Sequence, residues 1–300
     1  AKRCMHMRIS GPVLITGSVS GIGKATARRA IACGADVIIH GIDQASADAV
    51  CAELGAAFAV SGDLSDPAVP GMLIDAIIGK FGSIYGIVNN AANTGRSVLD
   101  NTTPELFDNM MAVNVRAPLL LIQAATPHMA ANGGGRIVNI GSVNAWCGER
   151  NLLAYSISKG ALLTLTRNLG DSLGPMGIRV NQINPGWVLT ENEIKIKRAE
   201  GMPDDWPNRL PATTTPSGSL IDPDELAATV CFFLSDLAPR VSGTIMDYEQ
   251  YPVIGRNPPK VKVYGGNIQK LKTTCFRRVI RGGETPPLTP YQPPAVYDKP

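Results

Sequence analysis

The 300-residue sequence has no uninterrupted apolar run approaching the ~20 residues that a membrane-spanning helix requires. Its basic first residues are followed by no long apolar segment and no cleavage site, so they do not resemble a signal peptide. The six cysteines form no CxxC pair, and the three histidines form no HExxH motif. We therefore expect no membrane partner and no metal site, and the scattered thiols predict a reducing, cytoplasmic location.

Positive charge is concentrated at the C-terminal end of the chain. Residues 256–300 contain nine Lys or Arg and two Asp or Glu, a net charge of +7, whereas the preceding 255 residues contain 19 basic and 23 acidic side chains, a net charge of −4. The proline pairs and weak helical periodicity of this segment predict an extended or disordered extension. An inter-subunit arm and a cloning or reading-frame artefact are alternatives. No nucleic-acid-binding module accompanies the basic residues, so nucleic acid is not an expected partner.

Strand-like and helix-like segments alternate between residues 10 and 250. Helical periodicity is clearest in residues 103–129 and in the segment that begins near Tyr155. This alternation predicts a single α/β domain with a Rossmann-type, doubly wound parallel sheet and helices on both faces. The expected strands are short apolar runs at residues 11–17, 36–40, 56–60, 84–92, 135–142, 178–184 and 241–246.

A glycine-rich turn at residues 17–23 (GSVSGIG) joins the first expected strand to an alanine-rich helix. Glycines let a pyrophosphate approach the backbone, and the helix N-terminus supplies N–H groups and a positive dipole end. We predict half of a dinucleotide-binding unit, although a tight turn without a ligand would share the pattern. Thr16, Asp63, Asn90 and Ser142 fall at the carboxyl ends of strands, where such sheets bind ligands.

Tyr155 and Lys159 are four residues apart in a helical segment, so their side chains should lie on the same face. A free tyrosine has a pKa of about 10, and a fixed cation beside it favours the phenolate and lowers that pKa. Such a pair is suited to taking a proton from an alcohol or returning one to a carbonyl.

Residues 190–223 differ from the alternating segments because Pro203, Pro207, Pro211 and Pro216 lie between short helical fragments. A long segment of this kind beside a sheet edge predicts a lid over the substrate. An ordinary surface excursion is the alternative.

Five motifs in the same order give the chain a resemblance to the short-chain dehydrogenase/reductase family over roughly residues 10–250. One departure is Ala92, where the family usually has glycine. The motifs are the TGxxxGxG pattern from Thr16 to Gly23, the NNAA run from Asn89 to Ala92, Ser142, the YxxxK pair of Tyr155 and Lys159, and Pro185-Gly186.

The resemblance implies four catalytic residues. Tyr155 would be the general acid/base, and Lys159 would lower its pKa and hold the nicotinamide ribose. Ser142 would hydrogen-bond the substrate oxygen. Asn114 would support a proton-relay water, although it is also typical of a polar residue that corrects a backbone bulge in a helix.

The resemblance further implies NAD or NADP as cofactor. NAD-using relatives place an acidic residue at the end of the second strand, where this chain has Gly41 followed two residues later by Asp43. No Lys or Arg occurs at residues 18–20 or 41–43, so we expect a preference for NAD. The implied contacts are Gly17, Ser20, Gly21, Ile22, Gly23, Asp63, Leu64, Asn90, Ala91, Tyr155, Lys159, Pro185, Gly186, Val188 and Thr190.

The substrate is expected to be a sugar, polyol or sugar acid, because the residues that flank the expected site are polar or charged. The alternatives are reduction of a 3-oxoacyl thioester and, in a different class, a non-catalytic NAD(P)-binding regulatory protein. By resemblance we expect a homo-oligomer, a tetramer built through the helices that carry Asn114 and Tyr155. The expected substrate contacts are Asn93, Asn144, Trp146, Arg150 and Trp187, and Arg150 could equally be a surface charge.

Overall fold

A computed structural model describes residues 7–253 of the chain. Its centre is a sheet of seven parallel strands in the order β3-β2-β1-β4-β5-β6-β7, which confirms the predicted Rossmann-type fold. The predicted extension at 256–300 lies outside the described residues. The strands are β1 (Gly11–Ile15), β2 (Ala35–Gly41), β3 (Phe58–Ser61), β4 (Gly86–Asn89), β5 (Gly135–Ile140), β6 (Ile178–Pro185) and β7 (Ile245–Tyr248).

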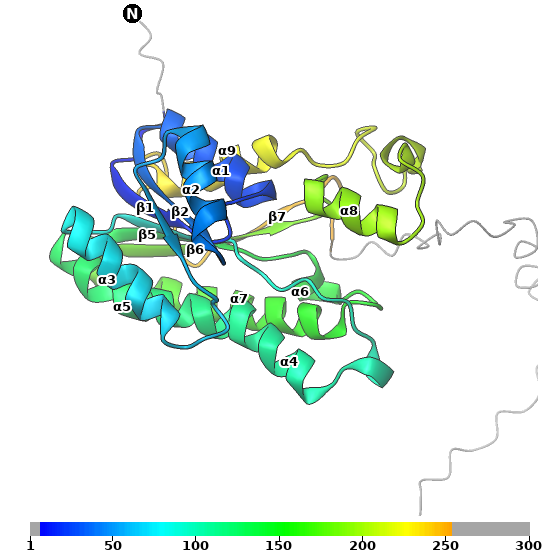
Figure 1. Cartoon of the computed structure of the whole chain (residues 1–300), viewed down its shortest axis with the longest axis horizontal. Coiled ribbons are helices and arrows are strands. Elements are labelled where there is room, and N and C mark those ends of the chain that lie inside the picture. The colour runs from blue at the N-terminus through cyan, green and yellow to red at the C-terminus, as the bar shows by residue number, and fades with distance from the viewer. Residues whose placement is uncertain (1–6, 254–300) are drawn as a thin grey trace, which may run out of the picture. The chain divides into compact units, whose positions relative to one another are not determined.

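Helices cover both faces of the sheet (Figure 1). Helices α1, α2 and α9 pack on one face and α3, α5 and α7 on the other, which gives two buried apolar clusters separated by the strands. The longer helices are α1 (Gly21–Ala32), α2 (Gln44–Leu54), α3 (Val69–Phe81), α4 (Pro104–Met111), α5 (Ala117–Ala131), α7 (Leu153–Ser172), α8 (Glu191–Ala199) and α9 (Pro223–Leu234). Short elements are α6 (Asn144–Cys147) and the single turns η1 (Leu99–Asn101), η2 (Ala112–Arg116), η3 (Gly174–Met176) and η4 (Trp206–Arg209).

The strand order reverses at β1, whose two neighbours are β2 and β4. A crevice forms at such a point because the connections from the two strands leave toward opposite faces of the sheet. All strands are parallel, so the loops that follow β1, β2, β3, β4, β5 and β6 emerge at the same end of the sheet. The predicted site residues are carried by these loops and by the helices that they enter.

Two expected elements differ from the prediction. The helical region 103–129 is divided into α4 and α5 by η2, a π-helical turn that contains Asn114. The last strand begins at Ile245 rather than at residue 241. Gly243 already donates to the carbonyl of Val180 on β6 at 2.8 Å, but its φ of 72° interrupts the extended geometry.

Two negative findings apply to residues 7–253. No helix in that part of the chain is long and apolar enough to cross a membrane. Over the same residues, no group of three or more His, Cys, Asp or Glu side chains has the arrangement of a metal site.

Candidate active site

The glycine turn after β1 brings α1 close to the start of the β4–α4 loop. Gly17 and Gly21 have positive φ values of 61° and 53°, and a Cβ at Gly23 would lie 2.5 Å from both the Asn90 amide nitrogen and the Gly17 carbonyl oxygen. No side chain caps the N-terminus of α1, where Ser20 is the N-cap residue. The first N–H groups of α1 are therefore oriented toward the turn without a side-chain acceptor, an arrangement that fits a phosphate group.

Asn90 and Ala91 are fixed to the end of β1 through Thr16. The buried Thr16 hydroxyl accepts from the backbone N–H groups of Asn90 and Ala91, both at 3.0 Å. The Asn90 amide donates to the carbonyls of Thr16 and Gly17 at 2.9 and 3.1 Å. No non-glycine residue in the described part of the chain has a positive φ, so Ala92 replaces the usual glycine without backbone strain.

Ser142, Tyr155 and Lys159 meet at the carboxyl end of β5. Ser142 lies two residues beyond β5, and Tyr155 and Lys159 lie one turn apart near the start of α7. The Ser142 side chain lies within hydrogen-bonding reach of the Tyr155 phenol. The Lys159 ammonium lies 5.5 Å from the centre of the Tyr155 ring and donates to the Ile140 carbonyl at 2.7 Å. The structure thus brings together three of the four predicted catalytic residues.

The pKa of Tyr155 differs from the sequence-based expectation. Burial raises it to about 12, and the hydrogen bond from Ser142 opposes that rise only in part. Burial also lowers the pKa of Lys159 to about 8. Desolvation of the phenol is thus the largest effect on its pKa in this arrangement, and it acts against the lowering that the sequence predicts from Lys159. Tyr155 is a neutral phenol at pH 7.

Asn114, the fourth predicted catalytic residue, is buried in η2. Its side-chain oxygen accepts from the Asn93 N–H at 2.7 Å. Its amide nitrogen donates to the Asn93 carbonyl and to the Ser158 hydroxyl, each at 2.9 Å. Asn114 thus joins the π-helical turn, the loop after β4 and the residue beside Lys159, which is the structural role that its position in a bulge suggests.

Gly186 and Thr190 are two of the three predicted cofactor residues on the segment after β6. Thr190 lies beside the glycine turn: its methyl group would be 3.4 Å from a Cβ placed on Gly21. A Cβ on Gly186 would meet the Glu249 carboxylate, which is the end of a flexible side chain and can move aside. A cavity of about 280 Å³ includes Gly21 and Thr190 in its walls, together with Lys24, Ala25, Arg28, Leu189, Glu191, Asp222, Pro223 and Asp224.

The remaining predicted cofactor residues occupy the same edge of the sheet. Leu64 is buried, while Asp63 is exposed and accepts from the Ser65 N–H at 2.8 Å. Pro185 ends β6, and Val188 forms an isolated bridge with Ile221 of the predicted lid.

The five predicted substrate residues are dispersed around the site. Asn144 donates its backbone N–H to the Ser142 hydroxyl at 3.1 Å, which places it beside the catalytic group. Asn93 is held by Asn114 and Asn109. Trp146 donates to Asp247 at 2.8 Å, and Arg150 is exposed.

Trp187 belongs to a cluster formed with residues 190–223. Its ring stacks on the buried Trp206 with centroids 5.2 Å apart, and its N–H donates to Glu193 on α8 at 3.0 Å. At the C-terminal end of α8, Glu200 pairs at 2.7 Å with Arg96 of the loop after β4. Residues 190–223 are therefore linked by side-chain contacts to two of the loops that carry site residues.

Ser142 is supported by a buried polar network that none of the sequence motifs indicated. Asn184 on β6 accepts from the Ser142 N–H at 3.2 Å and from Gln182 at 2.7 Å, and donates to Asp247 at 2.9 Å. Thr166 on α7 donates to Gln182 at 2.9 Å. The signal in the sequence was the run Asn181-Gln182-Ile183-Asn184, which places three polar side chains within a strand that is buried throughout.

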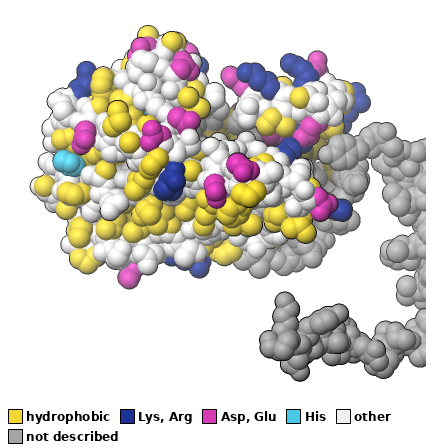
Figure 2. Space-filling view, turned by 60° about the horizontal axis from the view of Figure 1, so that its bottom comes forward, with side chains coloured by type: hydrophobic (Ala, Val, Ile, Leu, Met, Phe, Trp, Pro, Cys, Tyr) yellow, Lys and Arg dark blue, Asp and Glu magenta, His cyan; other side chains and the backbone are white. Residues whose placement is uncertain are grey.

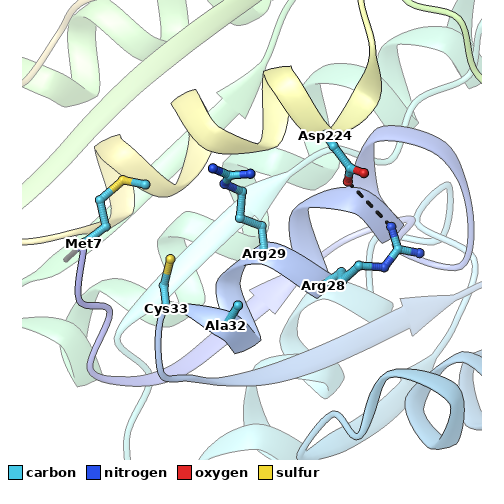
Figure 3. A pocket seen from close by; sticks show the side chains of 6 residues that line it. All are labelled: Met7, Arg28, Arg29, Ala32, Cys33 and Asp224. Atoms are coloured by element: carbon cyan, nitrogen blue, oxygen red, sulfur yellow. Dashed lines mark ion pairs between the residues drawn. The ribbon is translucent and has the colours of Figure 1, made fainter.

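The larger of the two described cavities lies away from the catalytic residues (Figure 3). Its volume is about 450 Å³, and it lies between α1 and α9, where Arg28 and Asp224 approach to 3.5 Å. Its lining residues include none of the predicted catalytic set: Met7, Arg28, Arg29, Ala32, Cys33 and Asp224. The convergence of polar groups at Ser142, rather than cavity size, identifies the candidate active site.

Comparison with known proteins agrees with this geometry. A family model described as enoyl-(acyl carrier protein) reductase matches residues 17–249. The chain belongs to the short-chain dehydrogenase/reductase family. It is therefore an oxidoreductase that acts on CH–OH groups with NAD(P).

Three similar proteins illustrate the range of substrates. The sorbitol dehydrogenase of Cereibacter sphaeroides is 34% identical over 75% of this chain and 91% of its own length. The 3-ketoacyl-(acyl-carrier-protein) reductase of Brucella melitensis, solved with NADH, has 32% identity and a TM-score of 0.72 over 80% of this chain and 97% of its own. The L-sorbose reductase of Gluconobacter frateurii, solved with NADPH and L-sorbose, has 27% identity and a TM-score of 0.76. The match covers 82% of this chain and 97% of the reductase.

Proposed function

We propose that this oxidoreductase interconverts a secondary alcohol and a ketone in a sugar, polyol or sugar acid, with Tyr155 as the general acid/base. The observation that carries the proposal is the meeting of Ser142, Tyr155 and Lys159 at the carboxyl end of β5, with the Lys159 ammonium 5.5 Å from the centre of the Tyr155 ring. The bound nicotinamide nucleotide supplies the hydride acceptor or donor. Proton transfer and the orientation of the substrate are assigned to side chains of this chain.

Each catalytic side chain has a distinct role in the proposal. The neutral phenol of Tyr155 donates a proton to the substrate oxygen during reduction and accepts one during alcohol oxidation. The Ser142 hydroxyl donates a hydrogen bond to the same oxygen as charge develops on it. Lys159 supplies positive charge next to the phenol, and its bond to Ile140 fixes the direction of its ammonium. Asn114 holds Ser158, and through it the turn of α7 that carries Lys159.

The adenosine and pyrophosphate of the nucleotide are assigned to the glycine turn, Asp63, Leu64 and Asn90. The uncapped start of α1 supports this assignment, because its N–H groups suit a pyrophosphate. We propose NAD as the preferred form. Asp43 is the acidic side chain nearest the end of β2 in sequence, and residues 41–43 contain no Lys or Arg. Asp43 also caps α2 by accepting from the Ser46 N–H at 2.8 Å, which fixes its carboxylate beside the end of β2.

Polar lining supports a hydroxylated substrate. Asn144 lies next to Ser142, and the paired Arg96 and Glu200 add charge to the loop after β4 and to the predicted lid. The lid assignment itself is supported by the links of residues 190–223 to the loops after β4 and β6. The similarity to a sorbitol dehydrogenase and to an L-sorbose reductase points in the same direction.

Reduction of a 3-oxoacyl thioester is a second candidate, favoured by the similarity to the 3-ketoacyl-(acyl-carrier-protein) reductase. Initial rates with a panel of sugars, polyols, sugar acids and a short 3-oxoacyl thioester, each with NAD and NADP forms, separate the two candidates. We expect turnover with a hydroxylated substrate and a lower KM for NAD. Turnover of the thioester alone would reject the sugar proposal, and a lower KM for NADP would reject the NAD preference.

A homotetramer assembled through α5 and α7 is also proposed. Leu119 on α5 and Ile157 on α7 are 40% and 45% exposed although both are large apolar side chains. Figure 2 shows hydrophobic side chains spread across the face to which the lower helices of Figure 1 belong. Light scattering at micromolar concentration should give the mass of four chains. We further propose a cytoplasmic location, because Cys33, Cys51, Cys147 and Cys231 are free thiols, as a reducing compartment would keep them.

A further inference from the structure

His40, which has no role in the proposed reaction, lies where three strand ends meet. It is the penultimate residue of β2 and its side chain is 2% exposed. The Gly17 N–H approaches its Nδ1 atom at 3.1 Å, and the Gly62 carbonyl approaches its Nε2 atom at 3.2 Å. A backbone N–H can only donate, so Nδ1 is the acceptor. Nε2 therefore carries the hydrogen and donates to Gly62.

The backbone of His40 strengthens the same connection. Its N–H donates to the Ser18 hydroxyl at 3.0 Å, and its carbonyl accepts from the Ser18 N–H at 3.0 Å. The neighbouring Gly41 carbonyl accepts from the Gly62 N–H at 3.1 Å. Gly17 and Ser18 begin the glycine turn, and Gly62 precedes Asp63 and Leu64. The end of β2 is thus bonded to the loops on both sides of it.

We propose that His40 is a positioning residue for the dinucleotide: its imidazole fixes the distance between the glycine turn after β1 and the turn after β3. The inference rests on the proposed assignment of the pyrophosphate to the first turn and of the adenosine to the second. An acceptor and a donor on opposite sides of one rigid ring hold both turns in place before the nucleotide arrives, so binding does not have to order them. A neutral imidazole is required, because a proton on Nδ1 would oppose the Gly17 N–H.

Three substitutions separate the two bonds. In His40→Asn the amide oxygen can take the place of Nδ1 and keep the bond from Gly17. In His40→Gln the longer amide can take the place of Nε2 and keep the bond to Gly62. His40→Leu removes both and leaves two backbone groups without partners. Ile38→Ala is the matched control. Ile38 is buried on the same face of β2, and its side chain has no group that could hydrogen-bond to either turn.

The experiment measures the Kd of NADH by fluorescence and that of ADP-ribose by calorimetry, alongside the thermal midpoint of each variant. We expect His40→Leu to raise both Kd values roughly tenfold or more, with smaller increases for the Asn and Gln variants. Ile38→Ala should lower the thermal midpoint without changing either Kd. Nitrogen NMR of wild-type protein should show His40 protonated at Nε2 alone.

Three results would overturn the inference. They are unchanged Kd values in a folded His40→Leu protein, equal losses of affinity in His40→Leu and Ile38→Ala at equal loss of stability, and an Nδ1-protonated ring in the wild type. Wild-type protein that binds no NADH would instead reject the proposed function itself. The two failures are therefore distinguishable.

Discussion

The Lys159 ammonium donates to the backbone carbonyl of Ile140 at 2.7 Å, so the helix that carries Tyr155 is bonded directly to the last residue of β5. The bond orients a buried cation whose pKa burial lowers to about 8. It also connects the two elements that supply Ser142 and Tyr155. The position of the ammonium relative to the phenol is therefore set by the sheet.

Replacement of Lys159 by Ala should lower kcat by roughly 10²–10⁴-fold, because it removes the charge that supports proton transfer by Tyr155. Lys159→Arg keeps the charge but changes its shape and reach, so partial activity at most is expected. Initial rates with an active substrate from the panel provide the measurement. Full activity in Lys159→Ala would remove the lysine from the mechanism.

Tyr155 should ionise above the ordinary tyrosine pKa of about 10 in the protein without added nucleotide. Burial raises its pKa to about 12, and the Ser142 hydrogen bond lowers it in part. The ultraviolet tyrosinate spectrum of wild type minus that of Tyr155→Phe isolates this one group. The difference should be absent at pH 10, and Ser142→Ala should raise the pKa further. A difference signal that titrates below pH 10 would contradict this prediction.

His40 should make the fold sensitive to acid. Burial lowers its pKa from 6.5 to about 4 in the folded protein. Between these values the unfolded chain binds a proton that the folded chain does not, so the free energy of unfolding falls as pH drops from about 6.5 to about 4. The full effect is about 3 kcal/mol. Urea unfolding of wild type and His40→Asn across this pH range should show a steeper loss of unfolding free energy for wild type. Parallel losses in the two proteins would show that the lowered pKa of His40 does not cause the acid sensitivity.

Replacement of Asn184 by Leu should destabilise the protein and disturb Ser142. Asn184 is completely buried, and its removal leaves the Ser142 N–H and the Gln182 amide without their acceptor. Each such group costs roughly 1–3 kcal/mol. Trp146→Phe removes one bond to Asp247 near the surface and should cost less than about 1.5 kcal/mol. Denaturant unfolding compares the two variants. Equal losses of unfolding free energy would show that the Asn184 network contributes little to stability.

The sequence predicted the elements that local pattern determines. Alternating apolar strands and helices gave the parallel sheet, and Gly17, Gly21 and Gly23 predicted the turn because their positions need a positive φ or a missing Cβ. Tyr155 and Lys159 were predictable as neighbours from the 3.6-residue period of a helix. These features depend on residues close together in the chain.

The remaining features depend on contacts between distant residues. His40 was one of three histidines without a motif, and its partners at Gly17 and Gly62 lie more than twenty residues away. The pKa of Tyr155 is raised because its phenol is desolvated by burial in the folded chain. The YxxxK spacing does not reveal that burial. Pairing of Asn184 with Ser142 likewise required the register of β5 against β6.

The central claim, that Tyr155 transfers the proton while other residues hold the nucleotide, is tested most directly with Tyr155→Phe. The measurement pairs turnover of an active substrate with the Kd of NADH on the same preparation. We predict a fall in kcat of roughly 10²–10⁴-fold with the Kd changed by less than about threefold. Turnover that survives the substitution would contradict the account.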